Sequence, residues 1–505
     1  MKVLLIEPRD MSIGLNVALG YLTASLIKNG IEVVGLSLSN LREYPPDHLE
    51  RYMIERHKPD LIGVNVFYSS YYFVRDMVTR IKAYYNKPII VGGPQMNIEG
   101  ANILKDIPEL DFAMVGESDH GLVKFCKTLE SKGVLDQVNG LIWRNEKEEI
   151  IVNAPQPVIE NLDELPFPSY KEFGVENIRI YTMMTSRGCP YNCYFCFRST
   201  RSWRTRSPEN MIEELHYARK HYGSKQFCIA DDSCNLRPER IIKFCKLLKE
   251  SGLNLPWHLT GARLDRMSDE LIIAVRDAGC EKVGVGVETL QEDVFKNINK
   301  GETLDQIRDT IHRLKKRGLY TSGYFIIGLP GDTPAKTWDT YKQAKKLGLN
   351  DIFFTLLLPF PGTKMYDMIY NRPDVKRLRD YRECNIYWYY TPKHSVLHSP
   401  FEVPEYTEEE KVDMFHRVWV YEGIPKPRYH SSLFMLGLRA MGLILKYDPL
   451  HFPIRLWRLG KRVGTRMYRS SGRTPRYSEI IFRKDFFPSK EYLEKMYGLS
   501  QVPLD

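Results

Sequence analysis

Two long runs of alternating apolar segments and amphipathic stretches constrain the fold of this 505-residue chain most strongly. The first run covers residues 1–132 and the second covers residues 178–365. An apolar segment of about four to eight residues that ends in turn residues is typical of a buried strand. Regular alternation of such segments with helical patterns predicts parallel sheets covered by helices. We therefore expect an α/β protein with two separate sheets.

The first run predicts a doubly wound, Rossmann-like sheet with helices on both faces. The expected strands are residues 3–6, 32–36, 61–66, 88–91 and 112–115, and helices are expected at 18–28 and 72–84. Ligands of such sheets bind at the carboxyl ends of the strands, where glycines let a backbone approach a ligand closely. That edge should contain residues 8–14, 66–70, 92–94 and 116–117.

The second run predicts six strand–helix units, with the chemistry at the carboxyl ends of the strands, as in complete barrels. The expected strands are 179–185, 226–230, 257–260, 282–287, 323–327 and 351–356. Helices are expected at 208–221, 238–251, 268–278, 304–317 and 334–347. Between the two runs, a hairpin (140–143 and 149–152) and several prolines predict a stiff linker.

Three cysteines, Cys189, Cys193 and Cys196, follow the first strand of the second run. Their spacing lets three thiolates bind one face of a metal centre, and sulfur ligands select iron–sulfur clusters or zinc. A closed zinc site needs a fourth ligand nearby, yet the next cysteines, Cys228 and Cys234, lie more than thirty residues further along. The spacing favours a reactive cluster with one open iron over a zinc knuckle or a chance grouping.

This triplet, with Phe195 directly before its last cysteine, resembles the motif of the radical S-adenosylmethionine (radical SAM) enzymes. The resemblance implies a partial (β/α)6 barrel and a four-iron four-sulfur (4Fe-4S) cluster held by the three cysteines. SAM would chelate the fourth iron next to Phe195 and be cleaved to methionine and a 5′-deoxyadenosyl radical. It also implies an external electron donor such as flavodoxin or ferredoxin, and sensitivity to oxygen.

The resemblance implies two charged contacts for the methionine part of SAM. Asp232 would receive the amino group in a charge-assisted hydrogen bond, although Asp232 or its neighbour Asp231 could instead cap a loop. Arg263, after the third strand, would pair with the carboxylate, and helix capping is the alternative.

For the nucleoside part of SAM, the resemblance implies Glu288 as the acceptor for both ribose hydroxyls. A glutamate buried at the end of an apolar strand costs free energy unless it has such a partner. Ile327 and Gly328 would belong to an apolar shelf for adenine, although taken alone their segment is consistent with any buried strand.

The first run resembles the cobalamin-binding domain that precedes many radical SAM domains. The matching residues are 4–8, 20–22, 91–94 and 111–117, and the site residues implied are Gly14, Gly92, Gly93, Pro94, Gly116 and Glu117. The D-x-H-x-x-G motif, which supplies a histidine to cobalt in other cobalamin proteins, is absent, because residues 10–14 read Asp-Met-Ser-Ile-Gly. Cobalamin would then bind without a protein imidazole. An empty Rossmann-like domain is the alternative.

The basic residues are concentrated near the C-terminus. Residues 431–484 contain twelve Lys or Arg against two acidic residues, a net charge of +10, so the rest of the chain sums to −1. Apolar residues and Trp457 alternate with these charges, which predicts an interfacial helix on anionic lipid. A solvated helix is the alternative, and nucleic acid is a less favoured partner. The aromatic run 387–390 would line a pocket for an apolar or planar substrate or belong to the core.

No segment has the length of a membrane span, and the N-terminal apolar run is too short for a signal peptide. We therefore predict a cytoplasmic protein, with peripheral contact at the inner face of the membrane. The expected segments are a cobalamin-binding domain (1–132), a linker (133–177), the radical SAM barrel (178–370) and a mainly helical, basic region for substrate or membrane association (371–505).

The resemblance implies an enzyme that uses methylcobalamin to methylate an unactivated carbon of an apolar substrate, such as a lipid, an isoprenoid or a tetrapyrrole. Ring formation, oxidation or hydroxylation of a similar substrate is the first alternative. A tRNA methylthiotransferase is disfavoured, because it would need a second cysteine triplet in the N-terminal domain, where Cys126 stands alone. A non-catalytic cluster carrier would need neither Glu288 nor the other residues at the strand ends.

Overall fold

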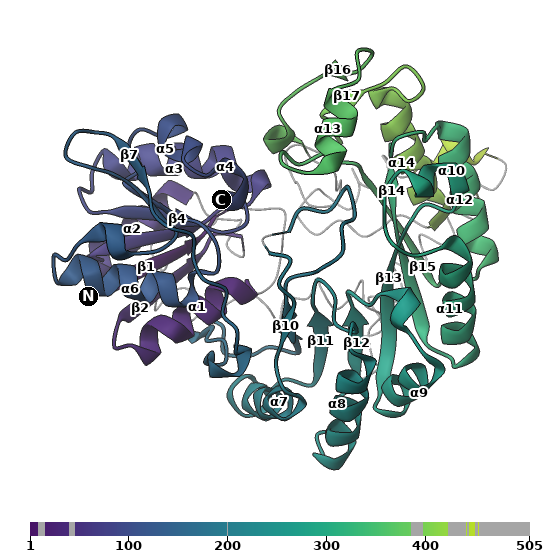
Figure 1. The fold of residues 1–505 in the computed structure, drawn as a ribbon, viewed down its shortest axis with the longest axis horizontal. Coiled ribbons are helices and arrows are strands. Elements are labelled where there is room, and N and C mark those ends of the chain that lie inside the picture. Colours follow the sequence, from purple (N-terminus) through teal and green to yellow (C-terminus); the bar gives the residue numbers. More distant parts are fainter. Residues whose placement is uncertain are drawn as a thin grey trace.

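The computed structural model describes residues 1–8, 16–39, 46–198, 200–384, 397–422, 441, 444–449 and 453. The predictions for Gly14, for the motif at 10–14, for the aromatic run 387–390 and for almost all of the basic segment 431–484 lie outside these residues. Two sheets stand side by side and form the framework of the chain (Figure 1).

The first sheet is mainly parallel, with strand order β2-β1-β3-β4-β5-β6-β7. Its parallel strands are β1 (Lys2–Glu7), β2 (Glu32–Ser37), β3 (Leu61–Asn65), β4 (Ile89–Gly92) and β5 (Phe112–Met114). All five strands predicted for this run are present. The predicted hairpin forms β6 (Leu141–Arg144) and β7 (Ile150–Val152), which pair antiparallel. Since β6 also pairs with β5, the hairpin is the edge of the first sheet and not part of a free linker.

Helices cover both faces of this sheet because successive residues of its buried strands point to opposite sides. On one face, Leu4 and Ile62 share a core with Met53 and Met77. On the other face, Leu5 packs in the core that contains residues of α1 and α6. The helices are α1 (Val17–Lys28), α2 (Pro46–His57), α3 (Tyr71–Lys82), α4 (Met96–Glu99), α5 (Asn102–Asp106) and α6 (Ser118–Glu130). The doubly wound prediction is confirmed.

The second sheet has six parallel strands in the order β15-β14-β13-β12-β11-β8. The strands are β8 (Ile180–Met183), β11 (Gln226–Ala230), β12 (Trp257–Thr260), β13 (Cys280–Glu288), β14 (Tyr320–Ile327) and β15 (Asp351–Leu356). Strands β8 and β15 are its two edges, so the sheet is an open, partial barrel. The predicted barrel is confirmed, and Figure 1 shows it to the right of the first sheet.

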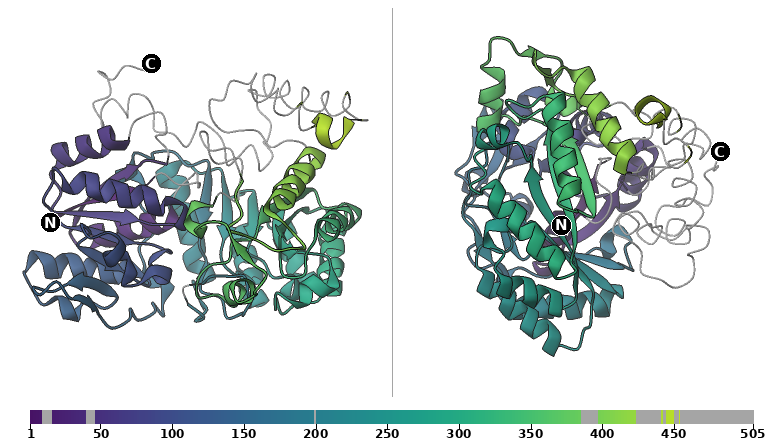
Figure 2. Two further views of the ribbon diagram at one scale, coloured as in Figure 1. Left: turned by 90° about the horizontal axis from the view of Figure 1, so that it is seen from above. Right: turned by 90° about the vertical axis from the view of Figure 1, so that its right-hand side faces the viewer.

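Helices follow most strands of the barrel and lie outside it (Figures 1 and 2). They are α7 (Pro208–Tyr222), α8 (Pro238–Glu250), α9 (Asp269–Asp277), α10 (Glu292–Lys296), α11 (Leu304–Lys316) and α12 (Pro334–Lys346). Side chains that accept hydrogen bonds from the first turn fix several helix starts, as Ser207, Thr303 and Thr333 do for α7, α11 and α12. This capping sets where each strand-to-helix loop ends.

The chain beyond the barrel folds back over the edge strand β15. After α13 (Lys364–Tyr370), the short strands β16 (Lys376–Arg377) and β17 (Phe401–Glu402) pair antiparallel. Helix α14 (Glu408–Glu422) then packs against β15 and α12. Within the part of the chain that is described, no helix is long and apolar enough to cross a membrane. The domain boundaries at residues 132, 177 and 370 stay predictions.

Candidate functional site

The three cysteines lie on one loop whose ends are held together by a short antiparallel pair, β9 (Ser186–Arg187) and β10 (Arg204–Thr205). Gly188 has a φ of +81°, and a Cβ at this position would lie 2.2 Å from the Ser202 carbonyl oxygen. Only glycine fits such a close approach without a shift of the backbone. The Cys189 amide donates to the Thr200 carbonyl at 3.3 Å, which closes the base of the loop.

The cysteine loop rests on the segment that follows α10. The Tyr194 amide donates to the Ile298 carbonyl at 3.0 Å, and the Asn299 side-chain amide donates to the Asn192 carbonyl at 2.9 Å. The Cys193 Sγ lies 3.8 Å from the Lys300 carbonyl oxygen. These contacts fix the cysteine loop to the segment that follows β13 and α10, and β13 lies three strands from β8 in the sheet.

The donor set fits an iron–sulfur cluster in its chemistry. Cys189, Cys193 and Cys196 are all free thiols. Burial raises the pKa of the Cys193 thiol, and the nearby charges of Lys300 and Arg263 act in the opposite direction and favour the thiolate. Over the residues that the structure describes, no three His, Cys, Asp or Glu side chains gather closely enough to hold a single metal ion.

The two neighbouring aspartates after β11 have different surroundings. Asp231 is buried and accepts hydrogen bonds from the Thr185 amide (2.6 Å), the Thr185 hydroxyl (2.5 Å) and the Ser186 hydroxyl (2.6 Å). It therefore joins the ends of β8 and β11. Asp232 is exposed, and no hydrogen bond or ion pair of its carboxylate occurs within the described ranges. Desolvation and the charge of Asp231 raise the pKa of Asp232. Asp232 is the aspartate available to a ligand.

Arg263 is engaged by the protein on all three of its side-chain nitrogens. Its Nε donates to Asp265 at 2.9 Å, and its Nη atoms donate to the Lys300 and Gly301 carbonyls at 3.1 Å each. Its guanidinium also lies 3.3 Å from the centre of the Tyr191 ring. Arg263 thus clamps the segment beneath the cysteine loop. Its role as a partner of the SAM carboxylate stays a prediction that would require part of this network to open.

Glu288, at the end of β13, has a left-handed backbone with a φ of +67°, which is uncommon for a residue other than glycine. Its carboxylate forms an ion pair with the Lys300 ammonium at 2.7 Å. Gly286 leaves room for this carboxylate, since a Cβ there would lie 2.5 Å from Glu288 Oε1. Lys300 also lies 3.7 Å from Glu302, and both side chains are largely buried. The charged pair of Glu288 and Lys300 therefore sits directly below the cysteine loop.

Lys300 is a site residue that was not predicted from the sequence. Burial lowers the pKa of its ammonium, but Glu288 and Glu302 outweigh this effect and raise the pKa overall. Residues 299–301 read Asn-Lys-Gly, a pattern that indicates a turn and gives no sign of a buried charge. The buried carboxylate expected at Glu288 was the only sign in the sequence that a cation should lie nearby. The chain has many lysines, so this sign could not point to Lys300.

The two residues predicted for the adenine shelf, Ile327 and Gly328, lie at the end of β14 and directly after it. Gly328 has a φ of +87°, and its amide donates to the Asp332 carboxylate at 3.0 Å. Ile327 is completely buried, while Tyr324 and Ile326, on the opposite side of the strand, are partly exposed. Strand alternation thus puts Ile326 and not Ile327 on the accessible face. Phe195 is partly buried against the core.

The carboxyl edge of the first sheet has features that fit a polar ligand such as cobalamin. Gly92 ends β4, and Gly93 and Pro94 follow it; a Cβ at Gly93 would lie 2.1 Å from Asn65 Oδ1. Asn65 ends β3 and is buried, yet its side-chain nitrogen has no hydrogen-bond partner among the residues described. A buried donor left without a partner is rare, and an amide-rich ligand would satisfy it. Gly116 follows β5 with a φ of +91°.

Glu117, also predicted to contact cobalamin, lies in the junction between the two sheets. Its carboxylate accepts hydrogen bonds from both Nη atoms of Arg204, at 2.5 and 2.9 Å, and from the Ile159 amide at 3.2 Å. Close by, Asp119 pairs with Arg187, which directly precedes the cysteine loop, at 2.7 and 3.2 Å. The ion pairs tie the start of α6 to both ends of that loop. A cobalamin contact by Glu117 stays a prediction that would require its ion pair to open.

A second set of contacts joins the carboxyl edges of the two sheets. The 3-10 turn η6 (Tyr381–Glu383) lies beyond the barrel and reaches α4 of the first domain. Arg382 pairs with Glu99 at 3.3 Å, and its guanidinium lies 4.2 Å from the centre of the Tyr71 ring. Both edges therefore face the same space, with the cysteine loop between them (Figure 1).

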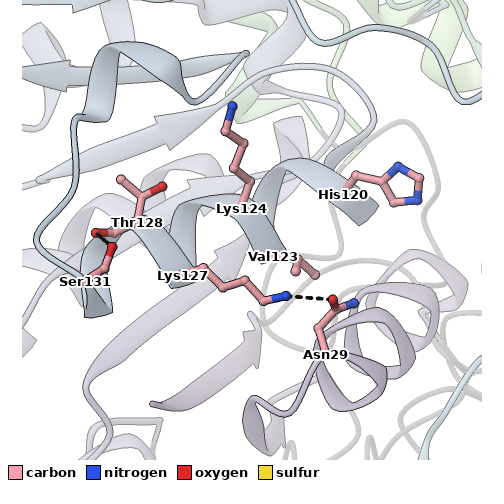
Figure 3. A pocket seen from close by; sticks show the side chains of 7 residues that line it. All are labelled: Asn29, His120, Val123, Lys124, Lys127, Thr128 and Ser131. Carbon is pink, nitrogen blue, oxygen red and sulfur yellow. Dashed lines mark hydrogen bonds between the residues drawn. The ribbon is translucent and has the colours of Figure 1, made fainter.

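A surface depression between α1 and α6 lies elsewhere (Figure 3). It is lined by Asn29, His120, Val123, Lys124, Lys127, Thr128 and Ser131. Lys127 donates to the Asn29 side chain at 2.9 Å across it. None of the predicted site residues lines this depression.

Comparison with known proteins agrees with this geometry. Residues 183–344 match the model of the radical SAM superfamily, and residues 11–125 match that of the B12 binding domain. An uncharacterized methyltransferase of Pyrococcus horikoshii is 31% identical over 325 residues, which cover 62% of this chain and 70% of that protein. The anaerobic magnesium-protoporphyrin IX monomethyl ester cyclase of Rubrivivax gelatinosus is 24% identical over 397 residues, with coverages of 74% and 71%.

Among solved structures, the fold resembles that of the radical SAM methyltransferase TsrM from Kitasatospora setae with cobalamin and a 4Fe-4S cluster bound. The TM-score is 0.68 at 16% identity, and the alignment covers 92% of this chain and 99% of that one. This likeness concerns the arrangement of both sheets.

Proposed function

Because this chain belongs to the radical SAM enzymes that carry a cobalamin-binding domain, we propose that it methylates an unactivated carbon of an apolar substrate. The observation that carries the proposal is that the carboxyl edges of both sheets face one cysteine loop. A substrate between the two edges would lie within reach of SAM at the cluster and of cobalamin.

When bound, the reduced cluster and SAM supply a 5′-deoxyadenosyl radical that abstracts hydrogen, and methylcobalamin supplies the methyl group. In the proposal, Cys189, Cys193 and Cys196 hold the cluster. Asp232 holds the SAM amino group, and Glu288 accepts the ribose hydroxyls while the ion pair with Lys300 orients its carboxylate. Asn65 and the glycine turn after β4 would hold cobalamin.

The apolar substrate is supported by aromatic side chains that come together from four segments. Phe360 lies at the centre, with ring-centroid distances of 5.5 Å to Tyr68, 6.3 Å to Phe197 and 5.9 Å to Tyr381. Tyr68 follows β3, Phe197 follows the last cysteine, and Tyr381 belongs to η6. All four rings are partly exposed. Such rings bind flat, apolar molecules well, which favours a tetrapyrrole over a lipid or an isoprenoid.

Ring formation or oxidation without methyl transfer is the second candidate. The similarity to a protein named as a magnesium-protoporphyrin cyclase favours it. Both candidates use the cluster, SAM and cobalamin, so the product decides between them.

We expect the protein, purified without oxygen and supplied with iron, sulfide and methylcobalamin, to retain about one corrinoid per chain in its absorption spectrum. With SAM and a chemical reductant it should release 5′-deoxyadenosine, and the variant Cys193→Ala should not, because it loses one of the three cluster ligands. Comparison of the metabolites of cells with and without the protein would identify the substrate. An unmethylated cyclic product would favour the second candidate, and a protein that retains no corrinoid would contradict the methyl-transfer proposal.

The location is part of the proposal and rests on the sequence of the basic segment 431–484 alone. A cytoplasmic enzyme with an apolar substrate would gain from peripheral contact with anionic lipid. We expect the full chain to float with vesicles that contain phosphatidylserine. A chain that ends before Ser431 should not float with them. Equal flotation of both chains would contradict a role of this segment.

A further inference from the structure

Four arginines surround the two residues that directly precede Cys193. The Arg198 guanidinium donates to the Tyr191 carbonyl and, at 2.8 Å, to the Asn192 side-chain oxygen. Arg201 donates to the same Asn192 oxygen at 3.0 Å. From the loop after β12, Arg266 donates to the Tyr191 hydroxyl at 3.3 Å, and the Arg263 guanidinium lies over the Tyr191 ring. We call Arg198, Arg201, Arg263 and Arg266 the arginine surface.

The positive charge of this surface is only partly neutralised. Arg263 is buried and lies 2.9 Å from Asp265 and 3.8 Å from Glu302, and Asp265 also lies 3.7 Å from Arg266. The hydrogen bonds of Arg198 and Arg201 go to neutral oxygens, and within the described ranges neither forms an ion pair. The Arg266 side chain is 51% exposed, and Arg201 is exposed as well. Outside residues 431–484 the chain has a net charge of −1, so this surface stands out from a nearly neutral body.

Holding the loop does not require this charge. Neutral amide side chains could make the same hydrogen bonds to Tyr191 and Asn192, without the repulsion between neighbouring guanidinium groups. That repulsion is relieved when an anionic surface binds. The surface also lies beside the residues that lead directly into Cys193, on the exposed side of the loop, since Pro190 and Asn192 are exposed.

We propose that the arginine surface docks an acidic protein that carries single electrons, of the flavodoxin or ferredoxin kind. The inference rests on the proposed function, which needs one electron for each SAM that is cleaved. The docked protein donates one electron to the cluster and is itself oxidised by one electron, and no bond forms or breaks at this surface. Complementary charge would orient the partner and raise its rate of association, an effect that salt weakens.

The test compares two double variants with the same change in net charge. Arg201→Gln with Arg266→Gln removes two positive charges from the arginine surface and keeps side-chain amides that can donate to Asn192 and Tyr191. Lys124→Gln with Lys246→Gln removes two positive charges at exposed positions on α6 and α8, away from the cysteines. Binding of oxidised flavodoxin is measured by titration calorimetry, and 5′-deoxyadenosine formation is measured with reduced flavodoxin and with dithionite. Iron content is measured for every variant.

We expect the arginine variant to bind flavodoxin about tenfold more weakly at low ionic strength and to lose a similar factor in the flavodoxin-driven rate. Its dithionite-driven rate and its iron content should be unchanged, and high salt should remove most of the difference. The lysine variant should behave as the unsubstituted protein. Equal losses in both variants, or an unchanged affinity, would overturn the proposal.

Two further outcomes separate the alternatives. If the arginine variant is slower with dithionite as well and regains its rate at high substrate concentration, the surface binds an anionic substrate and not a protein. If the unsubstituted protein forms no 5′-deoxyadenosine with dithionite, the proposed function fails. The flavodoxin titration would still decide whether the surface docks an acidic protein.

Discussion

The variant Lys300→Met should bind SAM about 10- to 100-fold more weakly than the unsubstituted protein. Removal of one partner from a buried ion pair leaves the other charge without compensation. Here the Glu288 carboxylate, 2.7 Å from the ammonium, would lose the partner that orients it and would turn toward water. This change would displace the acceptor proposed for the ribose hydroxyls. A charged hydrogen bond contributes about 1.5–3 kcal/mol, which corresponds to the expected loss of affinity.

The same strand provides a matched control at its opposite end. Lys282, near the start of β13, is buried and pairs with Asp351 at 2.9 Å. Lys282→Met therefore breaks a similar ion pair far from the cysteine loop. Equilibrium dialysis with SAM, iron analysis and thermal unfolding should be compared for the two variants. Similar SAM affinities for both variants would show that Lys300 contributes only to stability, whereas recovery of affinity in Lys300→Arg would support a role for its charge.

The strands of the barrel could be predicted closely from the sequence. The bounds of β11, β12 and β15 agree with the prediction to the residue. These are short, apolar segments between turn residues and well-capped helices, so local signals alone determine them. Strand β14 begins three residues earlier than expected, at Tyr320. Its first residues are polar and pair with their neighbours on β13, and a tertiary contact of this kind leaves no periodic signal.

The candidate site could be predicted only in outline, because its details depend on contacts between distant segments. The cysteines were predicted from their spacing, and Glu288 was predicted from the family resemblance together with its position at the end of a strand. The clamp between Arg263 and the carbonyls of Lys300 and Gly301 joins two different loops of the barrel, and the ion pair between Glu117 and Arg204 joins the two sheets. Arg263 and Glu117, which were predicted to contact ligands, thus have protein partners in the fold, whereas the Asp232 carboxylate has none among the described residues. The hairpin of β6 and β7 was likewise assigned to a linker, because its pairing with β5 is a tertiary contact that the sequence does not indicate.

The variant Lys411→Met should raise the stability of the protein by about 1–3 kcal/mol at pH 7, because it replaces a buried charge by an apolar side chain of similar size. Lys411, on α14, is 1% exposed. Its ammonium donates to the Phe401 carbonyl at 2.9 Å and lies 3.6 Å from the centre of the Phe401 ring. Burial lowers the pKa of Lys411 to about 7, although Glu402 and Glu408 oppose this effect. The folded protein therefore holds this proton less firmly than the unfolded chain does.

The pH dependence of stability distinguishes the cost of burying the Lys411 charge from an effect of side-chain packing. Between pH 7 and the ordinary lysine pKa of 10.5, the unfolded chain binds more protons than the folded protein, so the free energy of unfolding should rise with pH. The Lys411→Met variant has no titrating side chain at this position, so its free energy of unfolding lacks this rise with pH. Its advantage should be largest near pH 7 and should shrink by about pH 9.5, where the buried lysine is already neutral. Urea unfolding at both pH values measures this, with Lys346→Met at an exposed position of α12 as the control. If the variant is less stable than the unsubstituted protein at both pH values, the contacts of the ammonium with Phe401 outweigh the cost of burying it.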